Sequence, residues 1–285
     1  DVEHVLDDTG KITGARLKNA VGDLVVGTPI DYEGVGTMSK SKNNGVDPQD
    51  IIEKFGADTA RLYTMFTAPP EATLEWNDAG VEGSYRFLRR IWNFGCKLKA
   101  MNSGAIGTEA ACAKGLVDKE TKAFRLEVHT LLKQVDYDYQ RMQYNTVVSG
   151  GMKLLNALED FKGDISAASV AALREGFGIL LRCLYPATPH LTHALWSELG
   201  YAAEAGDLLD APWPEVDASA LQQDEIELVL QINGKLRGSV TVPAGADKAA
   251  IEAAALASEA FIKQVAGAPA KKVIVVPGRL VNIVV

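Results

Sequence analysis

Residues 36–48 read Gly-Thr-Met-Ser-Lys-Ser-Lys-Asn-Asn-Gly-Val-Asp-Pro, a polar loop that brings Lys40 and Lys42 together with Ser39 and Ser41. A lysine ammonium is a compact positive charge with three hydrogen-bond donors. Serine hydroxyls and backbone amides add further donors, so the composition suits the oxygens of a polyphosphate. The alternative is a solvated polar turn, because short motifs often arise by chance.

The loop leads directly into a helix start. Asp47 is a good N-cap residue, and Pro48 suits the first helical position. A short apolar helix is expected to follow, and Asp58 is expected to cap a second helix that ends before Pro69. Because a proline pair stands there and proline breaks helices, we expect the first part of the chain to comprise residues 1–68.

The tetrapeptide Met38-Ser39-Lys40-Ser41 resembles the second signature of the class I aminoacyl-tRNA synthetases, which usually reads Lys-Met-Ser-Lys-Ser. The residues that follow resemble the leucyl, isoleucyl, valyl and methionyl branch of that family. The resemblance implies that these four residues bind ATP and that Lys40 has the catalytic role, stabilising the phosphates during amino-acid activation. Thr37 stands where the family has its first lysine.

The bulk composition is that of an ordinary globular chain of 285 residues, with 47% hydrophobic residues and a formal net charge of −8. No uninterrupted apolar run is long enough to span a membrane. The first residues show neither an initiator methionine nor a signal pattern, so we expect a cut from a longer polypeptide. Three widely spaced cysteines predict free thiols in a reducing, cytoplasmic compartment, without a disulfide framework. They are Cys96, Cys112 and Cys183.

Hydrophobic patterning predicts a mainly α, multidomain chain. Residues 1–36 alternate as short strands separated by turn residues. Residues 69–206 show the periodicity of a helical bundle. Residues 207–224 are rich in proline and acids and are interpreted as a linker, and residues 225–285 as a separate α+β module. The expected early strands are 2–6, 12–17 and 24–26.

A long helix is expected to begin near Asn77 or Asp78. Its apolar residues mark one face, and Arg86 and Arg90 lie on the other. These arginines either form a solvated face or contact phosphates of an RNA backbone, for which arginine is well suited. The apolar face comprises Phe87, Ile91, Phe94, Leu98 and Met101.

The period changes to two after the linker. Asn233-Gly234 is a strong hairpin signal between two predicted strands, Asp247 caps a predicted helix, and two further strands complete a ββαββ module. Seven Lys and Arg residues against five Asp and Glu residues give this module a charge of +2. The Lys and Arg residues of the module either contact RNA or serve as solubilising charges on strand edges. The candidate RNA contacts are Lys235, Arg237, Lys271, Lys272 and Arg279.

Residues 231–238 and 271–285 closely resemble the C-terminal domain of bacterial leucyl-tRNA synthetases, and residues 185–191 resemble the closing helix of the class I anticodon-binding bundle. The resemblance covers essentially the whole chain. It implies the C-terminal part of an enzyme that joins leucine to tRNA(Leu) through a leucyl-adenylate, with ATP and Mg²⁺ in the parent and none bound to this fragment. It also implies a monomer that contacts tRNA(Leu) through the helical bundle and the C-terminal module.

The other class I signature, His-Ile-Gly-His, is absent, so the fragment is expected to be inactive alone. Alternatives are a stand-alone tRNA- or RNA-binding module, a helical scaffold, or part of a valyl, isoleucyl or methionyl enzyme. His190 and His193 share a helix face, but no further ligands stand at suitable spacing, so no metal site is expected. The histidines are His4, His129, His190 and His193.

Overall fold

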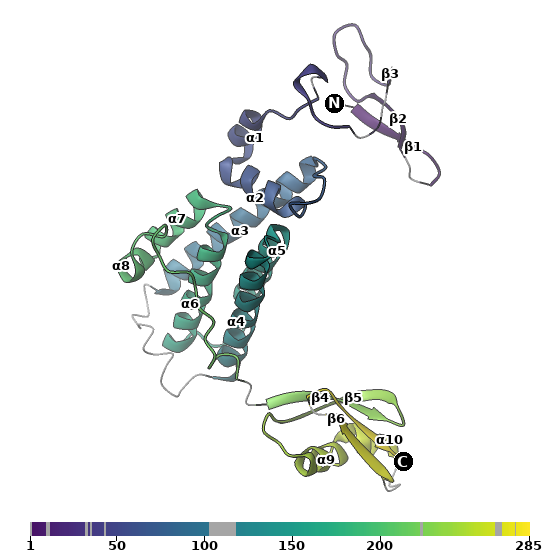
Figure 1. Ribbon diagram of the computed structural model, residues 1–285, viewed down its shortest axis with the longest axis vertical. Coiled ribbons are helices and arrows are strands. Elements are labelled where there is room, and N and C mark those ends of the chain that lie inside the picture. Colours follow the sequence, from purple (N-terminus) through teal and green to yellow (C-terminus); the bar gives the residue numbers. More distant parts are fainter. Residues whose placement is uncertain are drawn as a thin grey trace. The chain divides into compact units, whose positions relative to one another are not determined.

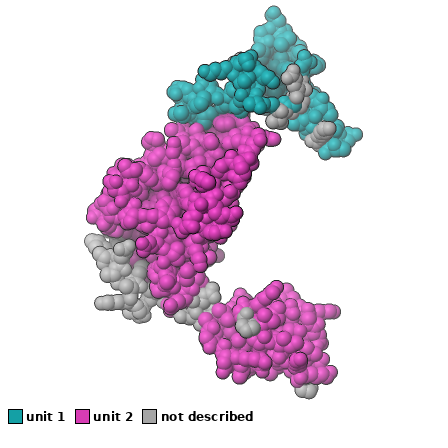
Figure 2. Space-filling view, in the orientation of Figure 1, with its two compact units in different colours: residues 1–54 teal, residues 55–285 magenta. Residues whose placement is uncertain are grey.

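The computed structural model is mainly helical, with two small sheets (Figure 1). Figure 2 shows its two compact units, residues 1–54 and residues 55–285. No helix in the described part of the chain is long and apolar enough to cross a membrane. The structure describes residues 2–9, 12–31, 34, 36–42, 44–102, 118–222, 225–265, 270–276 and 278–285.

The first unit contains an antiparallel sheet of order β1-β2-β3. The first two strands are confirmed, but the third lies later than the predicted 24–26. The reason is a second chain reversal: Gly27 adopts a φ of 86° and donates its N–H to the Leu17 carbonyl at 2.9 Å. That reversal delays the return to β2. The strands are β1 (Val2–Leu6), β2 (Ile12–Leu17) and β3 (Pro29–Ile30).

Helix α1 (Pro48–Phe55) begins where the sequence predicts. The Asp47 carboxylate accepts a hydrogen bond from the Gln49 amide at 2.9 Å, and proline occupies the first helical position, where no amide is needed. Residues 36–48, called the lysine loop from here on, therefore lead directly into a defined helix start.

The two compact units meet between Lys54 and Phe55, well before the expected boundary at residue 68. Helix α2 (Ala57–Thr67) lies in the second unit because its apolar face belongs to the bundle core. Leu62 is fully buried there and Tyr63 is 2% exposed. Helix α2, the last helix of the expected first part at residues 1–68, thus packs as a helix of the bundle.

Asp58 does not cap its own helix, contrary to the sequence prediction. Gly56 precedes α2 and no side chain caps it. The Asp58 carboxylate instead accepts hydrogen bonds from the Leu191 amide and from His190 Nδ1, both at 2.7 Å. Those groups lie at the start of α7 (Pro189–Glu198), so Asp58 caps a helix more than a hundred residues later.

The bundle is completed by further helices, of which those that follow Asp118 and Ser166 begin at a side-chain cap and α5 begins at Tyr144 without one. Asp118 accepts from the Thr121 amide at 2.7 Å, and Ser166 forms a capping box with Ser169. Residues 103–115, whose small side chains predict a loop, lie outside the described residues. Met142 is exposed because the preceding helix ends at Gln140. The helices are α3 (Asp78–Asn102), α4 (Lys119–Gln140), α5 (Tyr144–Glu159), α6 (Ala167–Leu184) and α8 (Tyr201–Ala205).

Glycines in α5 bring neighbouring helices into close contact. A Cβ on Gly150 would overlap the side chain of Val135 in α4. A Cβ on Gly151 would lie 2.9 Å from Leu184 Cδ2 in α6. Helix α5 therefore packs between α4 and α6 through positions where only glycine fits without rearrangement.

The segment interpreted as a linker packs on the bundle over much of its length. Leu208 and Ala220 are buried, at 3% and 8% exposure. The Trp213 ring meets Tyr139 edge-on, with centroids 5.2 Å apart. The physical reason is that apolar residues stand among the acids and prolines of this segment and pack against the helices of the bundle. Residues 207–222 are thus part of the bundle surface.

A half-buried ion network ties this segment to the bundle. Arg125 donates to both oxygens of Glu175, at 2.7 and 2.9 Å, and to Asp217 at 2.8 Å. His129 Nδ1 accepts from the Asp217 amide, so its Nε2–H donates to Glu175 at 3.1 Å. Burial alone would raise the pKa of Glu175, but the hydrogen bonds from His129 and Arg125 and the charge of Arg125 outweigh it and lower that pKa to about 2.

The C-terminal module has a sheet of order β5-β4-β7-β6, in which β4 and β7 are parallel. The hairpin is confirmed: Asn233 and Gly234 both have positive φ, at 51° and 76°. The single predicted helix is two helices, because Ser258 interrupts the first and caps the second through the Phe261 amide at 3.3 Å. The elements are β4 (Glu225–Ile232), β5 (Lys235–Pro243), α9 (Lys248–Leu256), α10 (Glu259–Val265), β6 (Lys272–Val276) and β7 (Leu280–Val284).

Gly150→Ala is expected to destabilise the chain by about 1–3 kcal/mol, because the new methyl group forces α4 and α5 apart. The matched control is Gly83→Ala in α3, where a Cβ meets nothing closer than 4.0 Å. Alanine there should stabilise the helix by about 0.5–1 kcal/mol. Urea unfolding followed by circular dichroism measures both, and equal shifts of the same sign would contradict the close crossing.

Glu175→Gln is expected to lower the free energy of unfolding at pH 7 on the order of 2–3 kcal/mol. The pKa of Glu175 is depressed in the folded chain, so its contribution is complete above about pH 4.5 and is lost as the pH falls toward 2. The difference between parent and variant should therefore shrink across that window. Glu198→Gln, which removes an exposed pair with Lys99, is the control and should change little.

Candidate functional site

The lysine loop is closed by the side chain of Asn44. Its Oδ1 accepts a hydrogen bond from the Ser39 amide at 2.8 Å, and its Nδ2 donates to the Thr37 carbonyl at 3.3 Å. Asparagine side chains commonly bond nearby backbone in this way. Asn44 is not among the residues predicted from the signature, although an asparagine five residues after Ser39 is a usable signal for such a loop closure.

The two serines and two lysines of the loop lie on one tight turn. Lys40–Lys42 form a 3-10 turn, Ser39 Oγ and Ser41 Oγ lie 3.3 Å apart, and the Lys42 amide donates to Ser39 Oγ at 3.3 Å. Lys40, Ser41 and Lys42 are exposed. Neither lysine forms an ion pair with any described residue. The turn can therefore present two positive charges and hydroxyl donors to an anionic ligand.

The two arginines predicted on α3 differ in their surroundings. Arg86 is exposed and pairs with no described carboxylate. Arg90 donates to Asn156 at 2.6 Å and forms an ion pair with Glu159, so it is held against α5. Arg86 is accordingly the better placed of the two to contact an external phosphate.

Register brings four of the five predicted basic residues of the C-terminal module to one end of its sheet. Lys235 pairs with Ile232, which pairs with Ile283, and Val273 lies opposite Ile283. Lys271 and Lys272 lie beside Val273 at this end, and Arg237 follows Lys235 on the other edge strand. Arg279 stands before β7, toward the opposite end. The edge strands thus flank one basic end of the sheet, a convergence that linear sequence does not show.

Within the described residues, one group combines three potential metal ligands: His129, Glu175 and Asp217. The Arg125 guanidinium already bonds both carboxylates, and His129 donates to Glu175. The Arg125 guanidinium takes the place that a metal ion would occupy and engages the carboxylate oxygens. The group is therefore an ion-pair network that holds residues 207–222 against the bundle.

Two family models match the chain. "tRNA synthetases class I (I, L, M and V)" matches residues 24–77, which include the lysine loop, α1 and α2. "Anticodon-binding domain of tRNA ligase" matches residues 121–253, from α4 into the C-terminal module. Helix α3 lies between the two matched ranges.

Curated relatives match over the whole chain. A leucine–tRNA ligase of Polaromonas naphthalenivorans is 92% identical over 285 residues, and one of Paracidovorax citrulli is 75% identical over 291 aligned positions. The chain spans 32% of the length of each of these relatives.

A solved structure also resembles the chain. The crystal structure of a LeuRS–tRNA–LeuAMS ternary complex from Agrobacterium radiobacter K84 aligns over 87% of this chain and 31% of that one, with a TM-score of 0.70 and 25% identity. Fold, family models and relatives agree with the residues of the lysine loop. Over its whole length the chain is therefore similar to leucine–tRNA ligases, and two parts of it match the class I tRNA synthetase model and the anticodon-binding domain model.

Proposed function

We propose that this chain is the part of a leucine–tRNA ligase that carries the lysine loop and the tRNA-binding domains. The parent would attach leucine to tRNA(Leu) through a leucyl-adenylate, consuming ATP. The observation that carries the proposal is the 92% identity, over every residue of the chain, to a leucine–tRNA ligase. A valyl, isoleucyl or methionyl origin would leave that identity unexplained.

The lysine loop is proposed to act on the ATP phosphates in the activation step, together with Mg²⁺. The leucine carboxylate attacks the α-phosphate and pyrophosphate leaves, so negative charge grows on the leaving group. The Lys40 ammonium opposes that growing charge, and Ser39 and Ser41 add hydroxyl donors. Asn44 is a positioning residue, since its bonds to Ser39 and Thr37 hold the turn closed. The contribution of Lys40 should therefore appear in the rate more than in leucine binding.

The domain roles follow from the same proposal. Residues 1–68 belong by function to the end of the catalytic domain, although α2 packs in the bundle. Residues 69–206 form the anticodon-binding-type bundle, residues 207–222 pack along it, and residues 225–285 form a tRNA-contacting domain. The protein is proposed to act in the cytoplasm as a monomer. Mass photometry of the intact ligase would check the monomeric state.

In the intact ligase, Lys40→Ala is expected to lower leucine-dependent pyrophosphate exchange by about 10²–10³-fold, with little change in the KM for leucine. Lys18→Ala, which removes an exposed lysine elsewhere in the same unit, is the control. The 285-residue chain alone should give no exchange above buffer. A near-normal rate for Lys40→Ala would mean that a loop with Thr37 in the first lysine position is not used for catalysis.

The basic end of the C-terminal sheet is proposed to contact phosphates of tRNA(Leu). Changing Lys235 and Lys272 together to Gln should weaken tRNA binding and flatten the dependence of log Kd on log salt by about 0.7–0.9 for each lysine. Lys248→Gln on α9, which pairs with Glu252, is the control. The test is the Kd for tRNA(Leu) measured at several salt concentrations. Deletion of residues 225–285 gives the largest loss of affinity and of salt dependence that the module can account for. An unchanged slope in the deletion would assign the lysines to solubility.

A further inference from the structure

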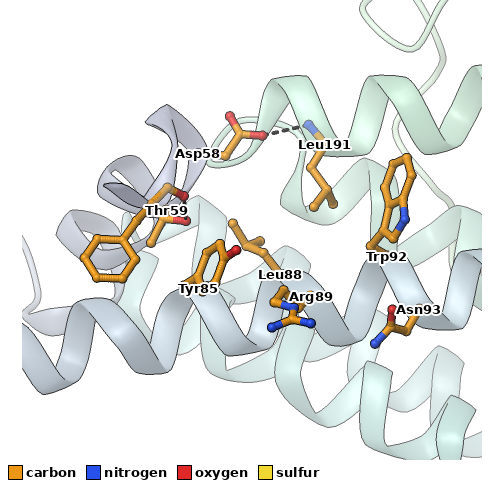
Figure 3. Close-up of a pocket in the computed structure, with 9 residues that line it drawn as sticks. Asp58, Thr59, Tyr85, Leu88, Arg89, Trp92, Asn93 and Leu191 are labelled. Carbon is orange, nitrogen blue, oxygen red and sulfur yellow. Dashed lines mark hydrogen bonds between the residues drawn. The ribbon is translucent and has the colours of Figure 1, made fainter. Parts of the chain in front are cut away.

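A hollow of about 360 Å³ opens on the bundle where α2, α3 and α7 meet (Figure 3). Tyr85, Arg89 and Trp92 line it from α3, and Leu191 lines it from α7. The three α3 residues are spaced four and three positions apart, so they share one face of the helix. Trp92 also lines an adjoining hollow of about 450 Å³. An aromatic and cationic surface is thus gathered around a concavity.

The Trp92 ring of this hollow is open to a ligand, whereas the Tyr85 ring meets the Phe55 ring edge-on with centroids 5.7 Å apart. Trp92 is 43% exposed and Tyr85 is 36% exposed. Trp76 and Trp196 use their indole N–H groups in hydrogen bonds, whereas Trp92 makes no hydrogen bond or ring contact with another described residue. Its position on an exposed face is not explained by packing. A large amphipathic ring left in this state is suited to stacking with a partner.

Arg89 is the cation among the described residues that line the hollow, and Arg86 lies outside that lining. The Arg89 guanidinium lies 6.0 Å from the Tyr85 ring centroid, in a cation–π arrangement. Arg86 stands one turn before Arg89, and neither forms an ion pair with any described residue. Asp58 also lines the hollow, but its carboxylate is engaged by the α7 amides and His190. The α7 helix dipole offsets that negative charge.

We propose that this hollow binds one unpaired nucleobase of the bound tRNA. The base stacks on Trp92 and Tyr85, the Asn93 amide reaches a base edge, and Arg86 and Arg89 meet the flanking phosphates. Unpaired RNA bases are recognised by stacking on aromatic rings and on arginine planes, and asparagine reads base edges. An apolar protein segment would leave the unpaired arginines without partners. The proposal rests on the proposed function, because it assumes that the chain binds tRNA(Leu).

The test measures the Kd of the 285-residue chain for a tRNA(Leu) transcript by fluorescence anisotropy over a range of salt. Trp92→Ala is expected to raise Kd by about 5- to 140-fold. Its salt slope should match the parent, since stacking releases no counterions. Arg86→Ala should instead flatten the slope by about 0.7–0.9. Trp92→Phe keeps a smaller ring and should give an intermediate Kd.

The matched control is Tyr137→Ala, because Tyr137 is an exposed ring on α4 with Arg141 at 5.4 Å and does not line the hollow. Its Kd should equal that of the parent, and all variants should share the parent unfolding midpoint. A Kd for Trp92→Ala within twofold of the parent would overturn the base site and leave the hollow to an apolar protein partner. Failure of the parent chain to bind the transcript would instead overturn the proposed function.

Discussion

The close approach of helices at glycine positions is the constraint on which the bundle depends. Gly150 and Gly151 leave room for the side chains of α4 and α6, and Gly95 does the same in α3, where a Cβ would lie 2.6 Å from Leu195. Interiors are packed as densely as organic crystals, so added methyl groups cannot be absorbed without moving a helix. The distance between α3 and α7, and hence the hollow around Trp92, follows from the same contact.

Buried charges in this chain are used to fasten segments that are distant in sequence. Asp58 caps α7, and Arg125 with Glu175 holds Asp217 against the bundle. A buried carboxylate is costly unless it is fully hydrogen-bonded, and both groups meet that condition. Removing one partner would leave the other uncompensated. These networks therefore fix the course of the chain more than they add to its net stability.

The basic side chains proposed to bind ligands lie where the fold leaves charge unpaired. The chain is acidic overall, at −8, yet Lys40, Lys42 and Arg86 lack carboxylate partners among the described residues, and four bases meet at one end of the C-terminal sheet. Net negative charge opposes indiscriminate binding of nucleic acid. Local positive sites with defined geometry then favour a partner that reaches several of them, as a folded RNA can.

Features that depend on neighbouring residues were predictable from the amino-acid sequence. Local hydrogen bonding and backbone preference determine the caps at Asp118 and Ser166, the Asn233-Gly234 turn and the lysine loop. The resemblance of residues 231–238 and 271–285 to leucyl-tRNA synthetases indicated the leucyl branch of the family. Contacts across long separations were not predictable: local rules assigned Asp58 to its own helix, and composition made residues 207–224 a linker. Their actual partners are His129, Arg125 and the α7 amides, which only the packing of the whole bundle brings near. The hollow at Trp92 is of the same kind, because a concavity belongs to three helices at once and to no single segment.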